Sequence, residues 1–176
     1  FYGQLDFGKM WAPLQGLRYR IQFGPEFRFG EFGTFNNNKG INGDGNNKAS
    51  WNHNTYRSWT LDNLVYYDRT FGDHKIGVTL MQSASAYHFD YANNSASNVA
   101  MESELWYNLK SSLNFDLGTG YGEKQMTSYM ARVNYGLMDK YLLTASIRWD
   151  GSSVLSPGHK WATFPSAALG WRIDRE

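Results

Sequence analysis

Alternation of apolar and polar residues is the feature that most constrains how this chain folds. In YLLTASIRWDGSS, residues 141–153, every second position from Tyr141 to Trp149 is apolar or aromatic. The positions between them include Arg148 and Asp150. Successive side chains of a β-strand point to opposite faces, so this stretch predicts a strand with one apolar and one charged face.

The same alternation recurs in seven segments, which predict an all-β protein. The segments start near residues 1, 16, 56, 74, 128, 141 and 160. Their connections are short near 13–16, 72–73 and 139–140, and long at about 31–55, 91–123 and 151–160. Short periplasmic turns that alternate with long extracellular loops are typical of outer-membrane barrels. We therefore predict an antiparallel transmembrane β-barrel segment of about seven strands.

A soluble β-sandwich also alternates and is the competing fold. The alternating runs are about 10 to 16 residues long, whereas soluble strands average ~5–6 residues and membrane strands need ~9–11. The polar faces carry many charges, and several apolar rows begin and end with Tyr or Trp, as at the two interfaces of a membrane. These features favour the barrel.

Composition excludes several classes of function. The chain has 17 Lys and Arg residues against 16 Asp and Glu, without a basic cluster, so nucleic-acid binding lacks an electrostatic footprint. It has no cysteine, which excludes disulfides and thiolate metal sites. Neither a run of ~18 apolar residues nor a charged leader followed by an apolar stretch is present, so we predict no transmembrane helix and no signal peptide.

Side chains suited to catalysis form no recognisable pattern. The histidines do not stand at metal-ligand spacing, and motifs for nucleophiles or phosphate binding are absent. We therefore predict no catalytic residue, no metal site, no cofactor and no enzyme activity. Rings in the long connections could stack on sugars, although packing within the loops is the simpler interpretation. These possible substrate contacts are Trp51, His53, Trp106 and Tyr107.

The second long connection has sequence features of a short helix. A short helix near 98–113 could be capped by Asn98, with acidic residues in its first turn, and the sequence leaves open whether it forms.

The charged strand faces should line a water-filled interior, where pairing of charges for structural purposes is favoured over contact with substrate. Their charged residues are Arg18, Arg20, Arg28, Arg132, Arg148 and Arg172, beside Glu26, Asp68 and Asp150.

The C-terminal third contains three motifs in a fixed order. SYMARVNY at 128–135 precedes YLLTASIRWDGSS at 141–153, and WATFPSAALGWR follows at 161–172. Their order and spacing resemble the SusC/RagA family of TonB-dependent outer-membrane transporters, although Val154 and Leu155 replace the family's usual Arg-Phe. The matching residues, which we interpret as structural, are Arg132, Tyr135, Arg148, Asp150, Gly151, Ser152, Ser153, Phe164, Pro165, Gly170 and Trp171.

The resemblance implies a Bacteroidetes-type barrel of about 22 strands, filled by an N-terminal plug and surrounded by outer-membrane lipid. It also implies a SusD-like surface lipoprotein as partner and TonB-driven import of oligosaccharides or peptides. Residues 1–176 would then be a partial barrel domain without plug or signal peptide, completed by the rest of its own barrel. TonB would act through the missing N-terminal region. The alternative is a structural or adhesive outer-membrane barrel anchor without active transport.

Overall fold

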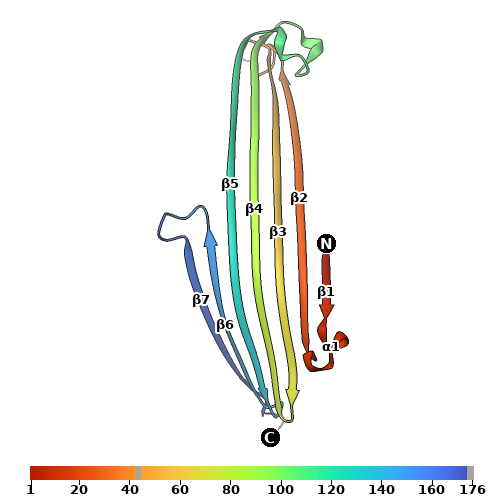
Figure 1. Ribbon diagram of the computed structural model, residues 1–176. Helices are drawn as coiled ribbons and strands as arrows, with labels where there is room; N and C mark the ends of the chain where they lie inside the picture. Colours follow the sequence, from red (N-terminus) through yellow and green to blue (C-terminus); the bar gives the residue numbers. More distant parts are fainter. Residues whose placement is uncertain (43–44, 174–176) are drawn as a thin grey trace. The chain divides into compact units, whose positions relative to one another are not determined.

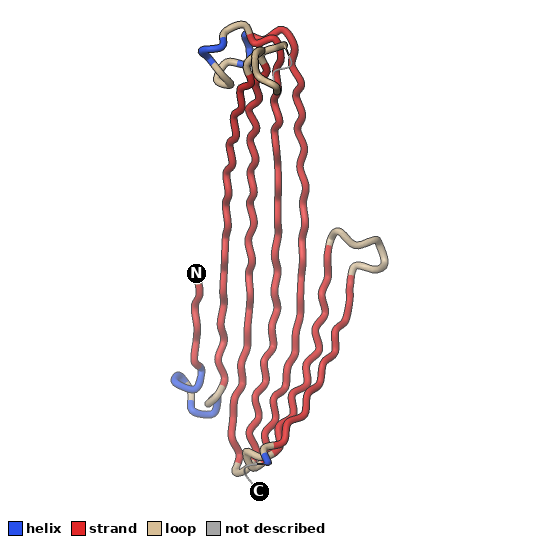
Figure 2. Tube along the Cα trace, turned by 180° about the vertical axis from the view of Figure 1, so that it is seen from behind, coloured by secondary structure: helices blue, strands red, loops and turns tan. Residues whose placement is uncertain are grey.

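The computed structural model describes residues 1–42 and 45–173. These residues form one sheet of seven antiparallel strands, in which each strand pairs with its neighbour in sequence (Figures 1 and 2). The sequence predicts these seven strands and this antiparallel order, and both are confirmed. The strands are β1 (Tyr2–Asp6), β2 (Leu17–Asn36), β3 (Lys48–Phe71), β4 (His74–Val99), β5 (Ser112–Leu137), β6 (Tyr141–Ser152) and β7 (Trp161–Trp171).

Strands β2 to β5 are longer than the alternation predicts, with 20 to 26 residues each. The connections predicted at 31–55 and 91–123 therefore shorten to 37–47 and 100–111, and positions 43–44 lie outside the described residues. The connection predicted at 151–160 spans 153–160. Part of the added strand sequence, such as ANNSASN at 92–98 in β4, is small or polar and lacks apolar alternation, but its backbone groups still pair with neighbouring strands.

The first predicted strand is also wrong in extent, because it ends at Asp6 rather than near residue 11. Asp6 Oδ1 accepts a hydrogen bond from the Gly8 amide at 3.1 Å and so caps the short helix α1 (Phe7–Met10). A 3₁₀ turn, η1 (Ala12–Leu14), follows. Gly16 then enters β2 with φ of 92°, where a Cβ would lie 2.0 Å from the carbonyl oxygen of Asp68. Only glycine fits this position.

No α-helix forms near 98–113. Asn98 and Leu105 have φ of 57° and 53°, a left-handed conformation that interrupts a right-handed helix. Two 3₁₀ turns form instead, η2 (Glu102–Glu104) and η3 (Leu109–Ser111). Side chains of this connection pack with β2 on a small buried cluster at the ends of β3 and β4. The cluster is Ala49, Ala96 and Val99, covered by Phe35, Trp106 and Leu109.

The chain divides into two compact units. Unit 1 comprises Phe1–Pro25, Trp59–Ala86 and Lys124–Glu176, and unit 2 comprises Glu26–Ser58 and Tyr87–Glu123. Unit 1 contains both tight turns, at Gly72–Asp73 and Met138–Lys140, and the Met138 amide donates to the Asp73 carbonyl at 2.8 Å. In the described part of the chain, the helices are too short or too polar to cross a membrane.

Candidate functional site

One face of unit 1 is apolar and exposed, and we call it the apolar face. Tyr129 lies opposite Trp149, and Tyr141 lies opposite Trp171, in the ladders of β5, β6 and β7. Directly opposed residues share a face, so rings stand at both ends of the apolar face. Tyr129 also stacks on Trp161, with centroids 6.1 Å apart. The apolar side chains between the rings, 40% to 85% exposed, include Val133, Leu143 and Leu169.

The opposite face of unit 1 carries ion pairs. Arg18 binds Asp68, and Arg148 Nε donates to Asp150 Oδ1 at 2.7 Å. Arg148 also reaches Ser128 Oγ at 3.3 Å. The sequence predicts paired charges at these arginines, and both pairs form. Because the side chains are partly exposed, each pair contributes no more than about 1 kcal/mol to the free energy of unfolding.

The other predicted arginines differ in their contacts. In unit 2, Arg28 Nη2 lies 2.7 Å from Glu26 Oε1, which is a third predicted pair. In unit 1, Arg20 donates to a glutamine of β1 at 2.9 Å instead of to a carboxylate. Arg132 and Arg172 are exposed. The charged positions therefore do not converge on one centre, as a catalytic site would require.

The Asp-Gly-Ser-Ser motif ties the end of β6 to its neighbours. A Cβ at Gly151 would lie 3.0 Å from the Trp161 indole, so the glycine gives that ring room. The Ser153 amide donates to the Gln125 carbonyl at 2.9 Å, and Ser153 Oγ accepts from the Gln125 amide at 2.9 Å. The motif therefore anchors the start of the 153–160 connection on β5. The structural interpretation of the motif stays a prediction.

Two of the remaining motif residues, Tyr135 and Gly170, lie against side chains of other strands or turns. The Tyr135 hydroxyl lies 2.6 Å from His74 Nδ1, next to the tight turn of β3 and β4. A Cβ at Gly170 would stand 3.4 Å from the Cβ of Leu142. The FPS motif lies in β7, with Phe164 opposite Arg148 and Pro165 opposite Ile147.

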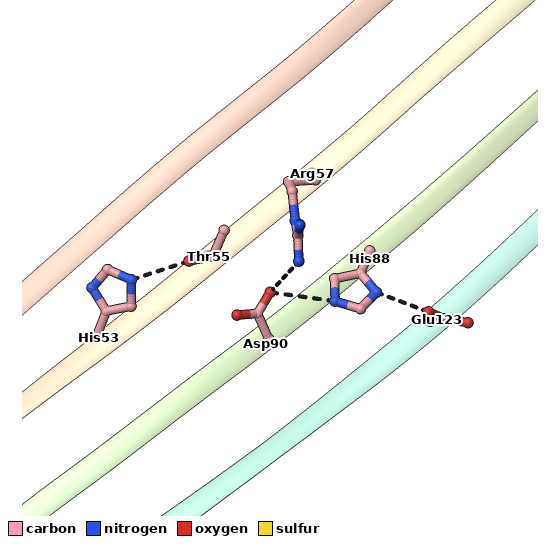
Figure 3. Close-up of polar contacts among 6 residues, drawn as sticks. All are labelled: His53, Thr55, Arg57, His88, Asp90 and Glu123. Carbon is pink, nitrogen blue, oxygen red and sulfur yellow. Dashed lines mark hydrogen bonds and ion pairs between the residues drawn. The ribbon is translucent and has the colours of Figure 1, made fainter.

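Unit 2 carries a chain of polar contacts across β3, β4 and β5 (Figure 3). Asp90 accepts from Arg57 at 3.0 Å and lies 3.3 Å from His88 Nε2. His88 Nδ1 in turn lies 3.0 Å from Glu123 Oε1. The sequence gives no indication of these polar contacts, because the residues that make them come from three strands. Among residues 1–42 and 45–173, no group of three or more His, Asp or Glu side chains could hold a metal ion.

The four predicted substrate contacts lie around one hollow in unit 2. Trp51, Trp106 and Tyr107 line the hollow, which has a volume of about 420 Å³. His53 lies beside it, 3.6 Å from the lining residue Glu31. The two rings of the 100–111 connection are 5.2 Å apart, and Tyr107 is 79% exposed. The structure thus brings the four residues together, and their contact with a substrate stays a prediction.

A second group of rings, which sequence reasoning missed, lies on β3 and β4 of unit 2. Tyr56 stacks on Phe89 at 4.6 Å and lies 6.3 Å from Tyr87, while Phe89 and Tyr91 are 5.6 Å apart. We call these four residues the ring track. The available signal was Tyr-x-Phe-x-Tyr at 87–91, which places three rings on one strand face.

Known proteins give these features a context. No family model matches the chain. It is 31% identical over 180 residues to TonB-dependent receptor SusC of Bacteroides thetaiotaomicron, a match that covers all of this chain and 17% of the receptor. It is 30% identical over 165 residues to TonB-dependent receptor P39 of Formosa agariphila, covering 92% of this chain and 16% of that receptor. The chain is a homologue of SusC-type TonB-dependent receptors.

Solved structures agree with these relatives. The RagAB peptide transporter matches with a TM-score of 0.82 and 18% identity, over 93% of this chain and 19% of that one. The closed-closed state of the RagAB peptide importer matches with a TM-score of 0.83 and 17% identity, over 99% and 20%. The predicted SusC/RagA resemblance and all-β antiparallel fold are therefore confirmed. The chain spans about a sixth of the length of these receptors.

Proposed function

We propose that this chain forms part of the barrel wall of a TonB-dependent importer in a bacterial outer membrane. The observation that carries the proposal is the apolar face of unit 1, which is exposed, edged by rings and backed by ion pairs. Lipid covers such a face, while water in the barrel interior hydrates the charges behind it. The homology to TonB-dependent receptors supports the same placement.

The dimensions of the apolar face support a membrane position. Tyr141 and Trp149 stand at its two ends in β6, eight residues apart. At ~3.3 Å per residue, this is roughly 26 Å along the strand. A tilt of ~40° reduces it to roughly 20 Å of height, which is close to the ~25 Å apolar band of outer-membrane barrels.

The relatives support a proposal for the cargo and the partner. We propose import of oligosaccharides or peptides, together with a SusD-like surface lipoprotein and driven through TonB. The RagAB structures are named as a peptide transporter and importer, which supports a peptide cargo, while rings on unit 2 suit sugars. TonB would act through receptor regions that the matched segment does not cover. On this proposal the protein is a transporter and not an enzyme.

An uptake experiment tests the importer against the anchor alternative. The gene of the full-length receptor would be deleted and restored in strains with and without TonB, and uptake of labelled oligosaccharides and peptides measured. We expect uptake only when both receptor and TonB are present, with the receptor in the outer-membrane fraction. A receptor that fractionates with the outer membrane, but whose deletion leaves uptake of every probe unchanged, would instead support a structural or adhesive anchor.

A further inference from the structure

We infer that the ring-track face of unit 2 binds an uncharged saccharide chain. The inference rests on the proposed function, because it names the cargo class of the importer. Tyr87, Phe89 and Tyr91 occupy alternate positions of β4 and so share one face, and Tyr56 of β3 stacks against them. Tyr87 is 41% exposed, and the other three rings are half-buried. The track therefore presents ring surface to solvent.

A glycine strip on β5 keeps one side of the ring track open. Gly118, Gly120 and Gly122 alternate along this strand and share a face. A Cβ at Gly120 would lie 2.6 Å from the ring of Tyr91, so the glycine gives that ring its space. A Cβ at Gly122 would meet nothing within 4 Å. The strand beside the track thus presents no side chain at these positions.

The same strand faces continue into a hollow of about 350 Å³, which polar side chains and three apolar ones line. Ser95 and Ser97 follow Tyr91 at alternate positions of β4, and Asp116 follows Gly118 in the same way on β5. Hydroxyl and amide groups dominate the polar lining, and Thr34 Oγ1 lies 2.6 Å from Ser50 Oγ. The polar lining residues are Thr34, Asn36, Lys48, Ser50, Ser95, Ser97, Asn114 and Asp116.

The charges of this face balance. Arg28 binds Glu26, which also accepts from Ser58 Oγ at 3.4 Å, and the hollow has one lysine and one aspartate. A face with balanced charge suits an uncharged ligand better than an ionic one. A sugar ring has an apolar C–H face that stacks on aromatic rings, and hydroxyls that exchange hydrogen bonds with Ser, Thr and Asn.

A peptide fits this face less well. One common mode of peptide recognition adds the extended peptide to a free strand edge through backbone hydrogen bonds. The ring track lies on β3 and β4, and both strands have hydrogen-bonded neighbours on each side in the sheet. The face therefore offers side chains rather than a backbone edge. We assign it to a saccharide on this ground, although the RagAB structures are named for peptides.

Binding measurements on the full-length receptor test the inference. Purified receptor would be titrated calorimetrically with gluco-, xylo- and manno-hexaose and with an uncharged hexapeptide. We expect at least one hexaose to bind, and the double variant Tyr87→Ala/Tyr91→Ala to weaken it at least about tenfold. Tyr87→Phe keeps the ring and should keep the affinity. Heat-modifiable migration in gels would show that each variant is folded.

Two glycine variants give a matched pair. Gly120→Ala should weaken binding of the hexaose, because the new methyl group displaces the Tyr91 ring. Gly122→Ala should leave the affinity unchanged. Tyr121→Ala, on the opposite face of the same strand, is a second neutral control. Equal loss from both glycine variants would count against the track. The inference is overturned if no hexaose binds, if the hexapeptide alone binds, or if only Trp106→Ala or Tyr107→Ala abolishes binding.

The binding test of the saccharide site and the uptake test of the importer can fail independently of each other. If TonB-dependent uptake persists while the folded ring-track variants bind and import normally, the importer proposal stands and the saccharide site fails. If the hexaose binds in a track-dependent way but no TonB-dependent uptake occurs, the saccharide site stands and the importer proposal fails.

Discussion

An arginine substitution on each face of β6 tests the assignment of the apolar face to lipid. Ile147 belongs to the apolar face, opposite Ala131 of β5 and Pro165 of β7, and Thr144 points to the charged face. Thr144 Oγ1 donates to Asn134 Oδ1 at 2.9 Å in an exposed position. We expect Ile147→Arg to destabilise the folded receptor more than Thr144→Arg does.

The position of Ile147 along its strand sets the expected difference in unfolding free energy between the two variants. Ile147 lies two residues from Trp149, which is roughly 5 Å of height below the ring at the end of the apolar face. Arginine costs ~2–4 kcal/mol at the midplane and ~0–1 kcal/mol near the interface, so Ile147→Arg should cost about 2 kcal/mol. Thr144→Arg loses only a hydrated hydrogen bond, less than about 0.5 kcal/mol. The unfolding equilibria should therefore differ roughly tenfold.

The assay is urea unfolding of the full-length receptor in lipid vesicles, followed by heat-modifiable gel migration. Ala145→Arg adds a depth control, because Ala145 lies midway between Tyr141 and Trp149 and should cost the most, about 3 kcal/mol. The expected order of destabilisation is Ala145→Arg, then Ile147→Arg, then Thr144→Arg. Equal losses at positions 144 and 147 would refute the lipid assignment of the apolar face.

Three further substitutions test local contacts. Gly33→Ala puts a Cβ 2.3 Å from the Trp106 indole, so the ring must move, and the tryptophan emission spectrum should shift. Asp150→Asn removes the anionic partner of Arg148 and should lower the unfolding free energy by about 1 kcal/mol, less at high salt, as urea midpoints would show. Ser153→Ala removes a side-chain acceptor from a β5 amide, and hydrogen exchange at that amide should accelerate.

The number and order of strands could be predicted because each strand of unit 1 has one apolar face. The alternation from Tyr141 to Trp149, for example, reports that face directly. The extension of β5 does alternate, with Leu113, Phe115 and Leu117 on one face, and the prediction missed it. The extension of β4 could not be predicted, since ANNSASN at 92–98 carries small or polar residues on both faces. Backbone pairing with adjacent strands holds such residues in the sheet, and single-sequence patterns do not report it.

The site residues also divide into those that the sequence predicts and those that it does not. Ring type and position in the predicted long connections indicate the four substrate-contact residues, and the structure places them around one hollow. The series of polar side-chain contacts that links Arg57 to Glu123 depends on the register between strands, and so does the stack of Tyr56 on Phe89. Register is set by contacts between residues more than 30 positions apart, so periodicity within one segment cannot report it.

The two tight turns have a consequence for the order of folding. Residues next to Gly72–Asp73 and next to Met138–Lys140 meet after closure of a loop of only a few residues, while Asn47 and Val99 meet across 52 positions. The entropy lost on closure rises with loop length, so pairing costs least beside the turns. We therefore expect the β3–β4 and β5–β6 hairpins to nucleate there and extend away from the turns, with the 37–47 and 100–111 connections ordered last.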